Sequence, residues 1–394
     1  MTAKTKALVA AGSVAALLVA GGFAGLAVGA FGPTTSSSTG GTASPQPSVR
    51  TTTGLPSTTK PTTRSATSIG QAFLADWVTD GRVIRRDQGG DTVSEGQAYG
   101  MLVAVGIGDE KSFRSIWSWT EKNLQRSDGS FAWRYDGGKV VDDMPAADAD
   151  VDIARALVLA GKKFDDASYT QSAARVGSAV LDTMTAVTPD GRILLPGPWA
   201  QGAGPWSYNP SYAAPASFAQ MATATGDARW TELEAGSRAV TGKILDATAL
   251  PSDWAQVRTD GSVVPLPSAT GTAGTVQYGY DAGRLAVRYA ESCEAPDVAL
   301  AARLLPALAG KTPLPMQLDL GGTALNADQS PLGYVARAAA EAGAGERTAA
   351  AKDLVAADRL AQSTPTYYGA AWDALGALQL QANALSACSP LKGQ

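Results

Sequence analysis

Apolar side chains recur at three- and four-residue spacing through most of the chain, from about residue 68 to its end. This spacing is the period of an amphipathic α-helix, and Gly, Asp or Pro residues separate the segments that carry it. The pattern predicts an all-α fold of about twelve helices. We expect them near 69–80, 94–107, 110–125, 149–162, 167–186, 210–225, 227–247, 280–291, 295–309, 331–343, 346–361 and 366–384.

Short and long connections alternate between these segments. Short breaks, such as Ala160–Gly161, join neighbouring helices as antiparallel hairpins, whereas longer Gly-, Pro- and Trp-rich stretches precede the helices at 149, 210, 280, 331 and 366. Six such hairpins can close into a ring whose long loops gather at one end, where a site would be built. A helical domain without ring closure has the same periodicity. We also expect short strands in the long loops, at 83–84, 131–135 and 193–195.

The chain divides by composition into three parts. Residues 1–31 are a signal or membrane anchor, in which Lys4 and Lys6 precede an Ala-, Gly-, Val- and Leu-rich run. Residues 32–67 are rich in Thr, Ser, Pro and Gly and predict a disordered tether. Residues 68–394 form the globular domain, for which an apolar content of 45% over the whole chain supplies a core.

The apolar run from Ala7 to Phe31 has two interpretations. It is long enough to cross a membrane, since roughly 20 residues suffice, and this favours an uncleaved anchor. The small residues Val28-Gly29-Ala30 are of the kind that signal peptidase cleaves, and they favour a removed secretory signal. Either way the lysines stay inside and the rest of the chain is extracytoplasmic.

The chain contains no histidine, which excludes Ser-His-Asp triads, Cys–His pairs and His-ligated metal sites. The net charge of -4, without a basic stripe, gives no indication of nucleic-acid binding. Cys293 and Cys388 form a disulfide or remain two buried thiols, since an exported location permits the bond. We expect a monomeric domain that needs no metal and no cofactor.

Carboxylates stand where loops become helices in three segments. Glu95 opens one apolar helical run, Asp148 and Asp150 precede a second, and Asp281 precedes a third. A carboxylate in this position caps free N–H groups and meets the positive end of the helix dipole, so each one alone is explained without catalysis. Together they are candidates for one convergent site.

Aromatic side chains are concentrated in the loops that feed the same end of the predicted ring. They are Trp133, Tyr135, Trp199, Trp206, Tyr208, Tyr212, Tyr278, Tyr367 and Tyr368. Flat rings beside polar groups suit sugars, although each ring alone is equally explained by core packing. Carboxylates among aromatics indicate glycoside hydrolysis, in which one acidic group protonates the leaving oxygen and the other acts on water or on the sugar.

The acid in such a reaction must hold its proton near neutral pH, so its pKa must be raised by burial or by a nearby negative charge. The helix N-terminus opposes this at Glu95. We therefore expect a close carboxylate, from the pair Asp148 and Asp150, to keep Glu95 protonated.

Six segments in order resemble family 8 of the glycoside hydrolases, the endoglucanase family that includes cellulases associated with bacterial cellulose synthesis. The segments are Gly81–Ile84 with Ser94–Met101, Pro145–Ala154, Leu195–Gly197, Tyr208–Tyr212, Tyr280–Arg284 and Tyr367–Tyr368. One position departs from the family pattern, because Ala147 stands where Ser or Thr is usual. The missing hydroxyl removes one hydrogen bond near Asp148, worth about 1 kcal/mol.

The resemblance implies an (α/α)6 barrel and an inverting endo-β-1,4-glucanase. It implies that Glu95 is the general acid, that Asp281 is the base for water, and that Asp148 holds the sugar. Tyr212 and Arg284 would flank the base and the water.

Tyr208 and Tyr368 lie in the matching segments and join the candidate substrate contacts, and we infer a stacking platform at Trp133. The expected partner is a β-1,4-linked polysaccharide, either cellulose or a related β-glucan. Two alternatives remain: a chitosanase or xylanase on the same fold, and a non-catalytic glycan-binding module. The sequence leaves open whether external polymer is digested or self-made polymer is trimmed.

Overall fold

The structure is a computed structural model that describes residues 64–382, 384 and 385. The predicted signal or anchor, residues 32–63 of the predicted tether, and Cys388 all lie outside these residues. The chain separates into residues 1–63 and a compact unit from Arg64 onward. Within the described residues, no helix combines the length and the apolar character that a membrane crossing requires.

The compact unit is mainly helical. Its α-helices are α1 (Ala66–Trp77), α2 (Ser94–Ile107), α3 (Glu110–Leu124), α4 (Ala147–Lys163), α5 (Ala167–Thr183), α6 (Pro215–Thr225), α7 (Arg229–Ala247), α8 (Arg284–Ala290), α9 (Ala295–Ala302), α10 (Leu305–Leu308), α11 (Pro331–Gly343), α12 (Arg347–Ser363) and α13 (Tyr367–Gly376). A π-helical turn, Ala377–Gln381, continues α13, and single 3-10 turns cover Arg86–Gln88, Pro198–Ala200 and Pro210–Tyr212.

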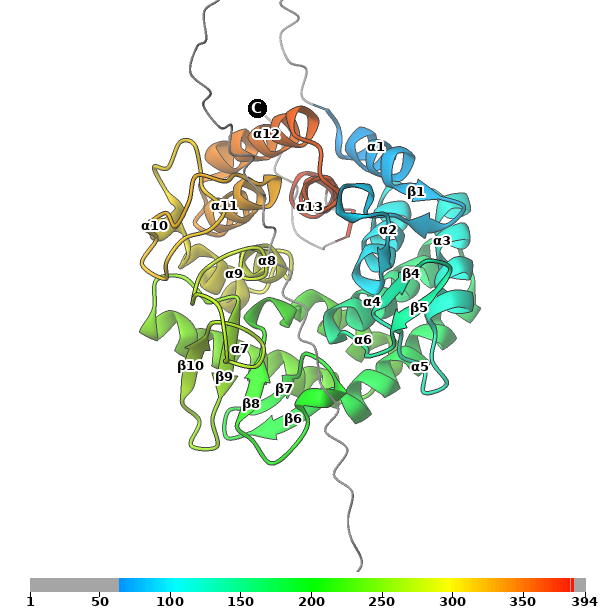
Figure 1. The fold of residues 1–394 in the computed structure, drawn as a ribbon, viewed down its shortest axis with the longest axis horizontal. Coiled ribbons are helices and arrows are strands. Elements are labelled where there is room, and N and C mark those ends of the chain that lie inside the picture. Colours follow the sequence, from blue (N-terminus) through cyan, green and yellow to red (C-terminus); the bar gives the residue numbers. More distant parts are fainter. Residues whose placement is uncertain (1–63, 383, 386–394) are drawn as a thin grey trace, which may run out of the picture. The chain divides into compact units, whose positions relative to one another are not determined.

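These helices form a closed double ring, an (α/α)6 barrel (Figure 1). The inner ring consists of α2, α4, α6, α8, α11 and α13, and the outer ring of α1, α3, α5, α7, α9 with α10, and α12. All of α8 and nearly all of α2 are buried, whereas α3 buries only one face. Helix α13 packs against both α1 and α2, which closes the ring. The predicted all-α barrel is confirmed.

Short antiparallel sheets occupy the loops. The strands are β1 (Val78–Thr79), β2 (Arg82–Val83), β3 (Thr92–Val93), β4 (Arg134–Asp136), β5 (Lys139–Asp142), β6 (Thr185–Thr188), β7 (Gly191–Leu194), β8 (Trp206–Tyr208), β9 (Trp254–Val257) and β10 (Val263–Leu266). They pair as β1–β2, β3–β4–β5, β6–β7 and β10–β9–β8. The strands expected near 83–84, 131–135 and 193–195 correspond to β2, β4 and β7.

Proline accounts for two differences between the predicted and the observed helices. The segment expected at 210–225 divides into the 3-10 turn Pro210–Tyr212 and helix α6, with Pro215 in the first turn of α6. The segment expected at 295–309 divides into α9 and α10, with Pro306 at the start of α10. Proline fits a first turn because it has no N–H to donate, and it fits poorly inside a helix.

The start of α2 is held by close packing. The buried Gln97 side chain accepts a hydrogen bond from Val83 N at 2.6 Å and donates to Gly81 O and Thr120 Oγ1. A Cβ at Gly96 would lie 2.9 Å from the Tyr367 hydroxyl, so only glycine lets α13 approach α2 so closely. These contacts fix the position of Glu95 between them.

Buried ion pairs join α4 to α8 and its C-terminal end. Arg155 and Glu291 form two hydrogen bonds of 2.9 Å, and both side chains are fully buried. Arg288 of α8 pairs with Asp152 of α4 and also lies over the Trp372 ring. Removing either partner of such a pair would leave an uncompensated buried charge, so we expect either substitution to destabilise the contact between α4 and the α8 region.

Candidate active site

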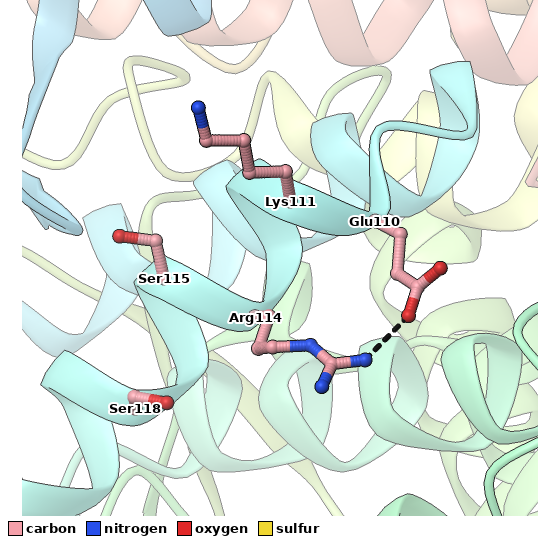
Figure 2. A pocket seen from close by; sticks show the side chains of 5 residues that line it. All are labelled: Glu110, Lys111, Arg114, Ser115 and Ser118. Atoms are coloured by element: carbon pink, nitrogen blue, oxygen red, sulfur yellow. Dashed lines mark hydrogen bonds and ion pairs between the residues drawn. The ribbon is translucent and has the colours of Figure 1, made fainter.

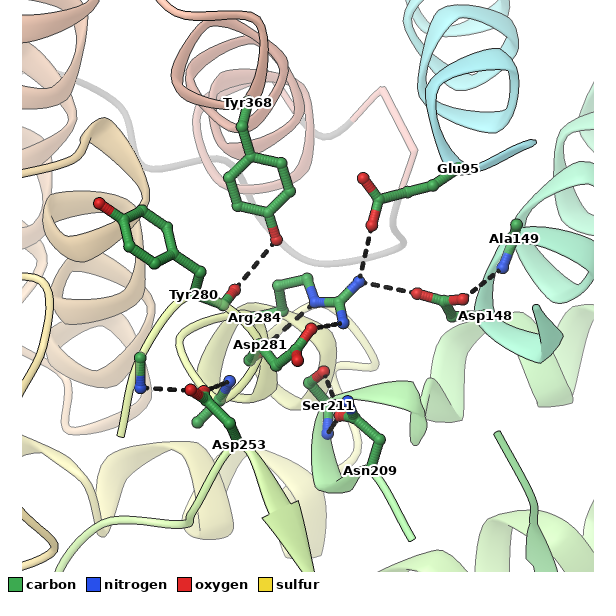
Figure 3. Close-up of polar contacts among 12 residues, drawn as sticks. Glu95, Asp148, Ala149, Asn209, Ser211, Asp253, Tyr280, Asp281, Arg284 and Tyr368 are labelled. Atoms are coloured by element: carbon green, nitrogen blue, oxygen red, sulfur yellow. Dashed lines mark hydrogen bonds and ion pairs between the residues drawn. The ribbon is translucent and has the colours of Figure 1, made fainter. Parts of the chain in front are cut away.

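The predicted carboxylates meet at the N-terminal ends of inner helices (Figure 3). Glu95 is the second residue of α2, and Asp148 is the second residue of α4. Asp281 lies in the turn that immediately precedes α8, and Tyr368 is the second residue of α13. Glu95 and Tyr368, which are 273 positions apart in sequence, therefore share one site, because the inner helices present the same end to it.

Arg284, the first residue of α8, contacts all three carboxylates. Its Nη1 donates to Asp148 Oδ2 at 2.8 Å and lies 3.3 Å from Glu95 Oε2. Its Nη2 donates to Asp281 Oδ1 at 2.6 Å. Glu95 and Asp281 thus contact different nitrogens of one guanidinium, so that cation sets the spacing between them.

Arg284 and Asp148 are more deeply buried than Glu95 and Asp281. The Arg284 and Asp148 side chains are 1% and 6% exposed, whereas those of Glu95 and Asp281 are 21% and 34% exposed. The guanidinium therefore forms the floor of the site. The two carboxylates that are expected to transfer protons are the ones that solvent, and hence a substrate, can reach.

The surroundings of Glu95 favour its protonated form. Burial raises the pKa of Glu95 to about 7; the Arg284 guanidinium opposes this rise, and the negative charges of Asp148 and Asp281 add to it. The sequence predicted a neighbouring carboxylate as the cause. Asp148 does contribute in that direction, but burial is the larger cause.

The raised pKa of Glu95 predicts a pH dependence. An acid with a pKa of about 7 loses its proton as the pH rises through that value, so kcat/KM should fall on the alkaline side from about pH 7 upward. The measurement is a pH profile of kcat/KM on a soluble β-glucan at constant ionic strength. A plateau that extends to pH 9 would contradict the assignment of Glu95 as the acid.

Asp148 is fully paired, and Asp150 is not. Asp148 Oδ1 accepts the Ala149 N–H at 2.9 Å while its Oδ2 faces Arg284, so both oxygens have partners without the hydroxyl that Ala147 lacks. Asp150 is fully buried and accepts only a long bond from Phe131 N, at 3.4 Å. Burial raises the pKa of Asp150 well above its usual value. Asp150 makes no contact with Arg284 and has the position of a structural residue.

Two of the predicted aromatic side chains lie beside the carboxylates. The Tyr212 ring faces the Arg284 guanidinium at 5.3 Å, a cation–π contact. The Tyr368 hydroxyl donates to Tyr280 O at 3.0 Å, in the segment that carries Asp281. Trp133 is half-buried, and its carbonyl accepts the Ser94 N–H at 2.9 Å, which places it next to Glu95.

Tyr208 was predicted to contact the substrate, but its side chain lies in the core. Its side chain is fully buried in a core cluster with Ile193, Trp206 and Val257, between the β8–β9–β10 sheet and α7. It has no exposed face for a sugar, so the structure does not bring it together with the other candidate contacts. The hydroxyl of tyrosine does not reveal from sequence alone whether the ring faces a core or a ligand.

Known proteins resemble this chain in sequence and in structure. The sequence profile of glycosyl hydrolases family 8 matches residues 65–380, most of the chain. The chain belongs to this family. Family 8 membership makes it a glycoside hydrolase, which agrees with the carboxylate cluster at the ends of the inner helices.

Relatives of this chain carry endoglucanase names. A probable endoglucanase of Novacetimonas hansenii is 34% identical over 65% of this chain and 76% of its own length. An endoglucanase of Cellulomonas uda is 33% identical over 47% of this chain and 54% of its own length. The structure of an endo-β-1,4-glucanase from Acetobacter xylinum superimposes with a TM-score of 0.66 and 30% identity, over 80% of this chain and 97% of the other.

Three residues of this family 8 site were not among the predicted ones. The buried Tyr99, one turn after Glu95, lies 3.4 Å from Arg284 Nη1 through its hydroxyl. Asn209 directs its side chain toward Asp281, and Asp253 binds the turn that carries Asp281. Tyr99 could have been found from its helical spacing to Glu95. Asn209 lies in the matching segment Tyr208–Tyr212, but the sequence links neither Asn209 nor Asp253 to Asp281, because they meet it through the β8–β9 pairing.

A surface depression lies elsewhere on this family 8 domain, along α3 (Figure 2). Its lining residues are Glu110, Lys111, Arg114, Ser115 and Ser118. All belong to one outer helix, and Glu110 pairs with Arg114 one turn later at 2.5 Å. This arrangement is that of a solvated helix face.

Proposed function

We propose that this family 8 hydrolase is an endo-β-1,4-glucanase that cleaves cellulose or a related β-glucan with inversion at the anomeric carbon. The observation that carries the proposal is the pair Glu95 and Asp281, held on different nitrogens of Arg284 and differing in their surroundings. Inverting enzymes need two such groups about 6.5–9.5 Å apart, with room for water between one of them and the sugar.

In the proposed mechanism Glu95 donates its proton to the leaving glycosidic oxygen. Asp281 accepts a proton from water while that water attacks the anomeric carbon from the opposite face. Asp148, which accepts hydrogen bonds from Arg284 and the Ala149 N–H, also accepts hydrogen bonds from the sugar hydroxyls. Tyr212, Tyr368 and Trp133 offer ring faces to the sugars on either side.

Arg284 suits these two proton transfers because its guanidinium contacts both the proton donor Glu95 and the proton acceptor Asp281. Before the reaction Glu95 is neutral and Asp281 is charged, and afterwards the two states are reversed. The total charge around the guanidinium is therefore unchanged. A fixed cation that serves both states needs no reorganisation during the reaction, which is the property that preorganised electrostatic catalysis requires.

Burial at Asp281 is compatible with a base. Burial raises the pKa of Asp281; the charge of Arg284 counters this rise, and the hydrogen bond from Arg284 lowers the pKa further. A carboxylate whose pKa is raised accepts a proton more readily than an ordinary one, provided that it is still ionised at the working pH.

We further propose that the enzyme acts outside the cytoplasm, on polymer that the cell meets or on cellulose that it makes. The apolar run at residues 7–31 and the Thr-, Ser- and Pro-rich stretch after it support this location. A long polysaccharide cannot cross a membrane, so intact cells that produce the full chain should hydrolyse soluble carboxymethyl cellulose.

The purified full chain should hydrolyse β-1,4-glucans and not chitosan or xylan, and proton NMR should show the α-anomer as the first product. The measurement is an assay panel of carboxymethyl cellulose, mixed-linkage β-glucan, chitosan and xylan. Preference for chitosan or xylan would transfer the proposal to that polymer, and inactivity on all four with retained binding would indicate a glycan-binding module. An initial β-anomer would exclude inversion.

A further inference from the structure

A second carboxylate lies directly behind Asp281. Asp253 Oδ1 accepts the N–H groups of Gly279, at 2.9 Å, and of Ala282, at 2.8 Å (Figure 3). These two residues flank Asp281 in the chain. The other oxygen, Oδ2, accepts a hydrogen bond from the Gln277 side chain at 3.1 Å. The Asp253 side chain therefore binds the segment that carries Asp281 at Gln277, Gly279 and Ala282.

The approach of Asp253 to this turn depends on a glycine. A Cβ at Gly279 would lie 2.5 Å from Asp253 Oδ2, closer than nonbonded atoms approach each other. Any other residue at position 279 would push the carboxylate away from the turn. Gly279, the residue immediately before the segment Tyr280–Arg284, therefore leaves the space that Asp253 needs to reach this turn.

The β-sheet explains why Asp253 arrives there. Strands β8 and β9 are antiparallel with Tyr208 opposite Ala255, so the residue after β8 and the residue before β9 lie at the same end of the sheet. These residues are Asn209 and Asp253. Asn209 directs its side chain to Asp281, and its own Oδ1 is fixed by the N–H and the hydroxyl of Ser211.

We propose that Asp253 is a positioning residue for hydrolysis, and that its Oδ1 holds the turn 279–282 so that Asp281 faces the attacking water. This inference rests on the proposed function, in which Asp281 is the base. Among the described residues, no other group accepts a hydrogen bond from the Gly279 or the Ala282 N–H, so without Asp253 both would be unpaired. Asp281 would then lose its fixed distance to Arg284 and to the sugar.

One oxygen of Asp253, Oδ1, accepts both N–H groups of the turn, so the negative charge of Asp253 is not required for these hydrogen bonds. Burial, with the negative charge of Asp281, raises the pKa of Asp253 to about 7, and its neutral form keeps Oδ1 as an acceptor. An asparagine at this position offers the same carbonyl oxygen. Alanine offers none. The two substitutions therefore separate the role of the acceptor from the role of the charge.

The first experiment compares Asp253→Ala and Asp253→Asn with the wild-type full chain. We expect Asp253→Ala to lower kcat on carboxymethyl cellulose by about 10²-fold, the usual effect of moving a reacting group by about 1 Å, with KM changed by less than about twofold. Asp253→Asn should restore kcat to within about threefold of the wild type. Equal losses in both variants, or a kcat of Asp253→Ala close to that of the wild type, would overturn the proposal.

Asp319→Ala is the matched control. Asp319 Oδ1 also accepts two backbone N–H groups, those of Gly321 at 3.0 Å and Thr323 at 2.7 Å, in an exposed turn with no contact to Asp281. Its removal should leave kcat unchanged. If Asp253→Ala does not fold, as judged by circular dichroism and thermal unfolding, Asp253→Ser takes its place, since a serine hydroxyl is too short to reach both N–H groups.

The decisive measurement is a double-mutant cycle with Asp281→Asn. If Asp253 acts through Asp281, adding Asp253→Ala to Asp281→Asn should cause no further loss of kcat. A purely structural role would cause the same additional loss in both backgrounds and would overturn the inference. Failure of the proposed function has a different signature, because the wild type itself would then hydrolyse none of the β-1,4-glucans.

Discussion

Glu95→Gln should lower kcat on carboxymethyl cellulose by about 10²–10⁴-fold, the range that a positioned general acid contributes. The glutamine has the shape of the protonated acid, and its carbonyl oxygen can still face Arg284, so the fold and the affinity for cello-oligosaccharides should persist. What is lost is the acidic proton that the leaving oxygen needs. Steady-state kinetics, with oligosaccharide binding measured by calorimetry, check this expectation.

The leaving group provides the sharper test of Glu95. A dinitrophenyl β-cellotrioside releases a phenolate that needs no protonation, so Glu95→Gln should hydrolyse it nearly as fast as the wild type does. Glu110→Gln is the matched control, since Glu110 is an exposed glutamate on α3 whose ion-pair partner is Arg114. If Glu95→Gln were equally impaired on both substrates, Glu95 would not be the acid.

Asp281→Asn should cause a loss of kcat of similar size, about 10²–10⁴-fold, for a different reason. The amide cannot accept a proton from the attacking water, although it can still accept a hydrogen bond from Arg284 Nη2. Since water must be activated whatever the leaving group is, the dinitrophenyl substrate should not restore turnover. Kinetics on carboxymethyl cellulose and on the dinitrophenyl substrate, run side by side, measure both expectations.

Asp260→Asn is the control for this second variant. Asp260 lies between β9 and β10, is exposed, and bonds only to Ser262 among the described residues. It should have wild-type activity. Full recovery of Asp281→Asn on the activated substrate would show that Asp281 acts in protonating the leaving group, and the roles of the two carboxylates would have to be exchanged.

The barrel was predictable because its signal is local. Apolar positions at helical spacing mark each helix, and alternating short and long connections mark hairpins. Glu95, Asp148 and Asp281 were predictable for a related reason: each stands at or just before the first turn of an inner helix, and such ends gather in a closed ring. Arg284 was recognised from its place in the segment after Asp281, but its contact with all three carboxylates was not.

The residues that the sequence did not reveal depend on pairing between distant segments. Asp253 and Asn209 reach Asp281 only because β8 and β9 are antiparallel in one register. Short strands leave weak patterns, and β9 and β10 were not predicted at all. Tyr208 shows the converse, since its matching segment placed it among the substrate contacts while the register of β8 turns its ring into the core.

The ring is closed by residues from the two ends of the compact unit. Arg64 bonds to Asp358 at 2.7 Å across 294 positions, and the Tyr367 N–H bonds to Asp87 at 3.2 Å across 280 positions. Closing such long loops is slow because the entropy is lost before the contacts are gained. During synthesis, a nascent chain that lacks α13 cannot assemble Tyr368 beside Glu95. Hydrolytic activity should therefore appear only when the last inner helix has emerged, so the growing chain is inert toward glucan until it is released.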